Sequence, residues 1–104
     1  MNHTSLVRAH SNPEYIAREL NINTATKSGM ALLDTFYENA SKRIAIDLLA
    51  KLPKREHDVL EDLLAKGDIE GVYALMREKL LNFQQFLTDE IQNEVRDTRA
   101  LMGS

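Results

Sequence analysis

The strongest constraint on the fold is a long helical periodicity over residues 24–52. Pro53 ends this segment, because proline disfavours the helical conformation of the residue before it. We therefore expect one helix that Asn23 or Thr24 caps and that ends at Leu52. About 28 residues in an α-helix extend about 42 Å, so this helix spans the width of a small domain.

The apolar residues of this segment form one stripe, because they recur at three- and four-residue steps. The stripe comprises Met30, Leu33, Tyr37, Ala40, Ile44, Leu48 and Leu52. Four more residues widen it, namely Leu32, Phe36, Ile46 and Leu49. A helix that is apolar over much of its circumference is typically covered on two sides. The pattern thus predicts the central helix of a helical fold.

The segment before the central helix divides into a tail and one short helix. Residues 1–11 are polar and aperiodic, so we expect a loose N-terminal tail, followed by a single helical domain over residues 12–104. Asn12 can cap the short helix. Pro13 suits its first position, where no backbone N–H is needed.

Two helices of moderate length follow Pro53, over residues 54–66 and 68–81. Gly67 suits a left-handed C-terminal cap, and Asp68 can cap the next helix. We expect the core faces of these helices to be Val59, Leu60, Leu63 and Leu64, then Ile69, Val72, Tyr73, Met76 and Leu80.

A final helix begins at Asn82, where Asn82 and Gln85 have the spacing of a capping box. Short connections between helices require neighbours to pack antiparallel or at a corner. The predicted fold class is therefore all-α, a compact bundle of about five helices with a long central second helix and a long C-terminal helix.

Charge and cysteine content exclude several classes of function. The net charge is −3, with 13 basic and 16 acidic residues, and no segment is basic enough to indicate a nucleic-acid binder. The chain has no cysteine, which excludes disulfides and thiolate zinc sites. The N-terminal residues lack the apolar run of a signal peptide, and no stretch is long enough to span a membrane. We expect a cytoplasmic protein that does not bind membranes.

No pattern of catalytic or cofactor-binding residues stands out. His57 lies between two acidic residues, with Glu61 one turn further, but a second histidine at metal-ligand spacing is missing. We interpret Glu56, Asp58, Glu61 and Asp62 as a hydrated helix face. Nucleophile elbows and glycine-rich phosphate loops are also missing. We therefore expect no enzyme activity, no cofactor and no metal.

The segment 52–67 has the sharpest local pattern, Leu-Pro-Lys-Arg-Glu-His-Asp-Val-Leu at its start and Gly67 at its end. It resembles the opening of helix-turn-helix domains in response regulators and sigma factors. Those families continue with a polar or basic recognition helix, whereas residues 68–81 begin with acidic residues. A small DNA-associated regulator stays open as an alternative, although we do not expect nucleic-acid binding.

A second pattern extends over residues 15–101. Ala-Lys-Gly-Asp at 65–68 precedes an Ile-x-x-Val-Tyr-x-Leu helix, and Leu81-Asn82-Phe83 opens a final acidic helix. A long helix carries Arg43 before an apolar run. These features resemble a bacterial family of small helical domains of unknown function. The resemblance implies a helical fold and transfers no functional residues.

The C-terminal helix carries the residues that we expect to bind a partner. These residues share a seam and are Leu87, Ile91, Val95 and Met102. The helix over 68–81 is shorter, so the end of the seam extends beyond that cover. An uncovered seam would pair with another helix, in a homodimer or with a protein partner. The competing interpretation is that the central helix covers the whole seam within one monomer.

These observations favour a non-enzymatic helical protein-interaction domain that acts through apolar helix faces. An acidic antitoxin or phage-type inhibitor has the same composition and stays open as a further alternative.

Overall fold

The computed structural model describes residues 5–80 and 82–102. Within these ranges the chain forms six α-helices and one turn of 3-10 helix, and no strand. The elements are α1 (Ser5–His10), α2 (Pro13–Glu19), α3 (Lys27–Lys51), η1 (Lys54–Glu56), α4 (His57–Lys66), α5 (Ile69–Lys79) and α6 (Phe83–Leu101). The all-α fold with a long central helix and a long C-terminal helix is confirmed.

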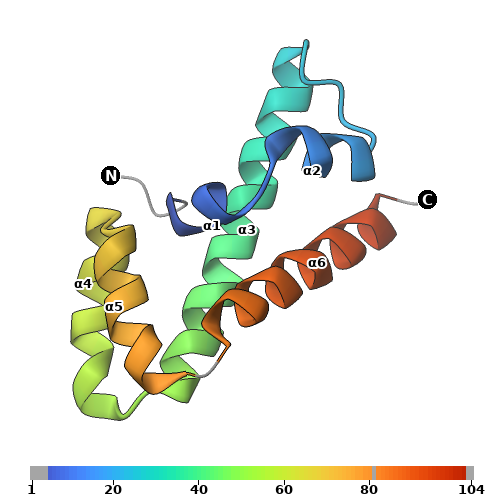
Figure 1. The fold of residues 1–104 in the computed structure, drawn as a ribbon. Helices are drawn as coiled ribbons and strands as arrows, with labels where there is room; N and C mark the ends of the chain where they lie inside the picture. Colours follow the sequence, from blue (N-terminus) through green and yellow to red (C-terminus); the bar gives the residue numbers. More distant parts are fainter. Residues whose placement is uncertain (1–4, 81, 103–104) are drawn as a thin grey trace.

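The two long helices form the frame of the molecule, which measures 42 × 25 × 18 Å (Figure 1). Helix α6 crosses α3, and α1 and α2 each pack against both of them. Helices α4 and α5 lie side by side as a hairpin at the C-terminal end of α3. The fold therefore packs α1, α2, α4 and α6 against α3, whereas α5 packs against α4 and α6.

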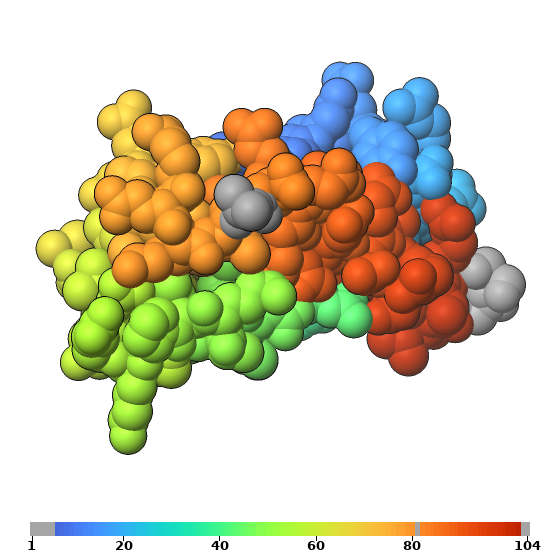
Figure 2. Space-filling model, turned by 60° about the horizontal axis from the view of Figure 1, so that its bottom comes forward, coloured from blue at the N-terminus to red at the C-terminus, as the bar shows by residue number. Residues whose placement is uncertain are grey.

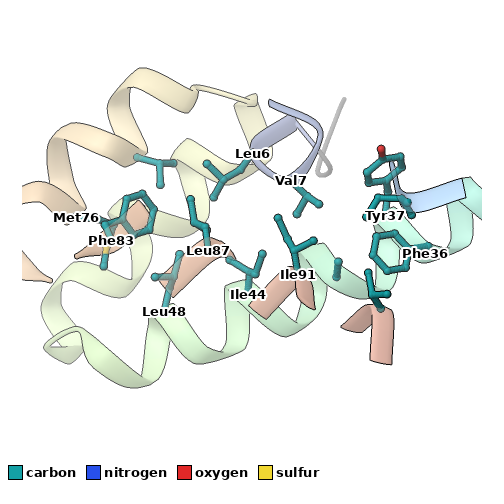
Figure 3. Packing of buried hydrophobic residues seen from close by; sticks show 14 of the residues in the cluster. Leu6, Val7, Phe36, Tyr37, Ile44, Leu48, Met76, Phe83, Leu87 and Ile91 are labelled. Atoms are coloured by element: carbon teal, nitrogen blue, oxygen red, sulfur yellow. The ribbon is translucent and has the colours of Figure 1, made fainter. Parts of the chain in front are cut away.

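The core lies where α3 and α6 cross and extends beneath α1 and the α4–α5 hairpin. In Figure 3, Ile44 and Leu48 of α3 lie beside Leu87 and Ile91 of α6. The buried residues of α3 are Gly29, Leu33, Phe36, Tyr37, Ala40, Ile44 and Leu48, and Leu52 follows them. The predicted stripe is thus confirmed over most of its length.

Three apolar residues of α3 that we assigned to the stripe are exposed. Met30 is 46% exposed, Leu32 49% and Ile46 65%, so their assignment to the core is wrong. Helices α1, α2, α4 and α6 cover other sides of α3. The apolar periodicity depends only on the sequence of α3. It does not indicate which sides of α3 the neighbouring helices cover.

Helix α1 occupies a segment for which we expected a loose tail. Leu6 and Val7 are buried in the core cluster, and Ser11 Oγ donates a hydrogen bond of 2.8 Å to the Val7 carbonyl. Helix α1 packs against α3 and α6. The expectation is therefore wrong for residues 5–10, while residues 1–4 lie outside the described residues. A helix this short is stabilised by tertiary packing, which leaves no periodic pattern in its sequence.

Several predicted caps are present. The Asn12 side chain accepts a hydrogen bond of 2.9 Å from the Glu14 N–H, and Pro13 begins α2. Gly67 adopts φ = 69°, the left-handed conformation that favours glycine, and ends α4. The Asp68 side chain accepts from the Gly71 N–H at 2.9 Å. These local predictions are confirmed.

Two other capping predictions are wrong. Thr26 caps α3, because its hydroxyl accepts a hydrogen bond from the Gly29 N–H, while Asn23 Oδ1 accepts from Ala25 in the preceding turn. Asn82 has φ = 61° and makes no side-chain capping bond. An N-cap residue normally has an extended backbone, so the left-handed conformation of Asn82 is incompatible with the capping box.

The α4 core face is narrower than expected. Leu60 is buried, and Leu63 and Leu64 are half-buried against the core. Val59 is 50% exposed, so its assignment to the core face is wrong. Helix α4 packs against α3 and α5 on its other side.

Candidate functional site

The predicted partner-binding seam of α6 faces the interior of the monomer. Leu87, Ile91 and Val95 are buried in the core cluster, and Met102 is 45% exposed. Helices α1, α2, α3 and α5 all pack against α6, and Figure 3 shows Leu87 and Ile91 among core side chains. The structure therefore differs from the expected uncovered seam. The competing interpretation, in which the seam is covered within one monomer, agrees with the burial of Leu87, Ile91 and Val95.

The segment 52–67 forms η1 and α4, and α5 then runs back beside α4 (Figure 1). Lys54 and Arg55 are exposed, but the exposed side of α4 carries Asp58, Glu61 and Asp62. Three carboxylates on that side repel the phosphates of a nucleic acid. The hairpin thus offers no continuous basic surface along α4.

His57 joins the start of α4 to the end of α3. It is half-buried, and its Nε2 lies 3.1 Å from the Leu52 carbonyl oxygen. Among residues 5–80 and 82–102, no group of three or more His, Asp or Glu side chains is placed to hold a metal ion. The contact of His57 is therefore with the backbone of the connecting segment.

A cluster of charged side chains links α3 to α6. Arg43 of α3 contacts three carboxylates that lie on successive turns of α6. Its guanidinium nitrogens lie 2.7 Å from Asp97 Oδ2, 3.1 Å from Glu94 Oε1 and 3.9 Å from Glu90 Oε2. Thr98 also donates a hydrogen bond of 3.0 Å to the second oxygen of Glu94. We call Arg43, Glu90, Glu94 and Asp97 the Arg43 cluster.

The members of the Arg43 cluster differ in their electrostatic environment. The hydrogen bond from Arg43 lowers the pKa of Asp97, and the same bond raises the pKa of Arg43. Glu90 is 8% exposed, and its pKa is raised from 4.5 to about 7, with burial as the largest cause. A hydrogen bond with the neighbouring Asp47 and repulsion from its carboxylate contribute to this rise, whereas Arg43 and Lys51 oppose it. Glu90 is therefore the group of the cluster that titrates near neutral pH.

A neutral hydrogen bond joins α1 to α5. The Tyr73 hydroxyl pairs with His10 Nδ1, and the Tyr73 ring meets Phe83 edge-on at 5.3 Å between centroids. Burial lowers the pKa of His10 and raises the pKa of Tyr73. Both shifts favour the uncharged forms, so this pair connects α1 to the hairpin without a charge.

An open hollow of about 490 Å³ lies between the end of α5 and the start of α6. Arg77, Asn82 and Gln85 supply polar groups, and Phe83 forms part of the wall. Its described lining residues include neither a carboxylate nor a histidine. Those residues supply no group for acid–base chemistry near neutral pH.

One side of α3 is a long exposed surface that none of the described helices covers. Its residues lie at three- and four-residue steps and thus on one helix face. They are Leu32, Thr35, Asn39, Lys42 and Ile46, and all are exposed. We call them the outer face of α3. Figure 2 shows part of α3, in green, open to solvent between the hairpin and α6.

No helix within the described residues is long and apolar enough to cross a membrane. No family model, curated protein or solved structure matches the chain. The resemblance to a bacterial helical family therefore stays a prediction.

Proposed function

We propose that the chain is a non-enzymatic helical protein-interaction domain that binds its partner through the outer face of α3. The observation that carries the proposal is the placement of Leu32 and Ile46. Both are large apolar side chains, about half or more exposed, and they lie on the same face of one helix. They are fourteen positions apart in the sequence, which corresponds to about 21 Å along the helix axis.

Single exposed apolar residues are common on protein surfaces and indicate nothing by themselves. The outer face differs because its two apolar residues stand at its ends, with Asn39 midway between them. Seven-residue steps on one face are the spacing at which a second helix meets the first. The surface therefore suits an amphipathic helix that lies along α3.

The surroundings of this face support the same interpretation. Ala31 and Ala50, outside the five residues of the outer face, and Thr35 within it are exposed and small, so a partner backbone can approach closely at these positions. Glu38 and Lys42 are exposed and offer one charge of each sign near the middle of the helix. Such charges select the partner and its orientation more than they add affinity.

Affinity capture from the native cell extract tests this proposal. The wild-type chain should retain a specific protein that the Ile46→Asp variant loses. Val59→Asp is the matched control, because Val59 is also an exposed apolar residue, 50% against 65% for Ile46, and lies on α4. Circular dichroism should give the same helix content for all three chains. Identical captured proteins from all three would refute binding through the outer face.

A further inference from the structure

We infer that the outer face of α3 pairs with the same face of a second copy of this chain, in antiparallel orientation around a twofold axis at Asn39. This inference rests on the proposed interaction function and specifies its partner.

The apolar residues are placed symmetrically about Asn39. Leu32 lies seven residues before it and Ile46 seven residues after it, each about 10 Å from the centre. When two α3 helices cross antiparallel at Asn39, Leu32 of one copy meets Ile46 of the other. The same contact recurs on the other side of the axis. The surface is thus self-complementary, as a twofold dimer requires.

The charges on α3 favour this orientation over a parallel one. In the antiparallel pair, Glu38 of one copy comes within about 3 Å, measured along the axis, of the level of Lys42 of the other. Glu38 of each copy can then form an ion pair with Lys42 of the other, one pair on each side of the twofold axis. A parallel pair in register would place Glu38 and Lys42 of one copy and those of the other on opposite sides of the seam, so these ion pairs could not form.

Asn39 stands at the axis and is exposed in the monomer. Its amide carries both donors and an acceptor, so two copies can hydrogen-bond to each other across the axis. A single central asparagine in a helix seam is known to specify the register and the number of helices. With two apolar residues per copy, the pair is smaller than a standard interface, so we expect a weak dimer that forms at high concentration.

Sedimentation equilibrium over a range of concentrations tests the self-association. The apparent mass of the wild type should rise toward that of a dimer, whereas Ile46→Asp should stay monomeric and Val59→Asp should behave as wild type. Lys42→Glu should raise the dimer Kd by about 2- to 30-fold, because each exposed ion pair contributes modestly and two are lost. The double variant Glu38→Lys, Lys42→Glu should restore dimerisation, because it exchanges the two charges.

Disulfide cross-linking tests the orientation, since the chain has no cysteine of its own. Asn39→Cys should form a covalent dimer under mild oxidation. A mixture of Leu32→Cys and Ile46→Cys chains should cross-link, whereas Leu32→Cys alone should not. Cross-linking of Leu32→Cys alone, without the mixed product, would show a parallel pair and overturn the inference.

The two proposals can fail separately. A wild type that stays monomeric at every concentration and forms no Asn39→Cys cross-link overturns the self-pairing. The proposed function survives that result if capture from the native extract still depends on Ile46. If the wild type and Ile46→Asp also capture the same proteins, both proposals are wrong.

Discussion

The Glu90 carboxylate lies 3.9 Å from Nε of Arg43, at the outer limit of an ion pair. The same guanidinium is closer to Glu94 and Asp97, so Glu90 receives the weakest compensation although it is the most buried of the three acids. Charging a buried carboxylate without a close cation costs free energy. The Arg43 cluster therefore joins α3 to α6 and leaves one member that favours a bound proton.

We predict that Glu90 makes the folded protein less stable as the pH rises from about 4.5 to above 7. The pKa of Glu90 is about 7 in the folded chain and takes its ordinary value of 4.5 in the unfolded chain. In this window the folded state holds the proton more tightly, so its stabilisation is lost as the pH passes through the folded-state pKa. Glu90→Gln should remove this loss, which is on the order of 3 kcal/mol. Urea unfolding at pH 5 and pH 8 measures it.

His10 acts in the opposite direction, because burial lowers its pKa and favours the neutral form. Its contribution to stability increases as the pH rises toward 6.5. The comparison of Glu90→Gln with the wild type cancels this contribution, since both chains keep His10. Parallel stability profiles for the two chains would contradict the role of Glu90.

Helix α1 should contribute measurably to stability. Leu6 is buried and lines the same narrow gap as Leu64 and Val72 of the hairpin. Leu6→Ala should lower the free energy of unfolding by about 2–5 kcal/mol, the usual cost for a buried leucine. Ala9→Ser is a control at an exposed position of α1 and should change it by less than about 0.5 kcal/mol. A small effect of Leu6→Ala in chemical denaturation would mean that α1 is not packed on the core.

Gly29 should resist replacement by alanine. Replacement of glycine by alanine inside a helix normally stabilises the helix by about 1 kcal/mol. A Cβ at position 29, however, would lie 1.8 Å from the backbone oxygen of Asn23 and 3.0 Å from Oγ1 of Thr26. The preceding turn would have to move, so we expect Gly29→Ala to destabilise the protein by about 1–3 kcal/mol. Thermal unfolding measures the change in stability, with Ser28→Ala at the exposed neighbouring position as the control. A Gly29→Ala variant more stable than the wild type would contradict the tight contact.

The Arg43 cluster and the outer face of α3 left a partial signal in the sequence. Glu90, Glu94 and Asp97 lie at four- and three-residue steps, which places them on one side of α6. That spacing could have indicated a shared cation, but it does not identify Arg43 as the residue opposite. Asn39 and Lys42 share a face with Leu32 and Ile46, and this mixture could have indicated an exposed surface.

What the sequence by itself determined is local. The ends of the helices depend on residues a few positions apart, as at Asn12, Gly67 and Asp68, and those caps lie where their short-range chemistry requires. The long stripe of α3 and the α6 seam also follow from periodicity within one helix. Their apolar residues are the largest part of the core.

Only the tertiary structure decided which apolar faces are covered. The α6 seam lies in the core because α3 crosses it and α1 folds back onto both helices, whereas Ile46 is exposed because none of the helices in the described part of the chain packs on that side. The pairing of Arg43 with three carboxylates and the raised pKa of Glu90 likewise need two helices from distant parts of the chain. Burial and electrostatic interactions depend on distances in space, and residues about 50 positions apart in the sequence carry no local pattern that reveals them.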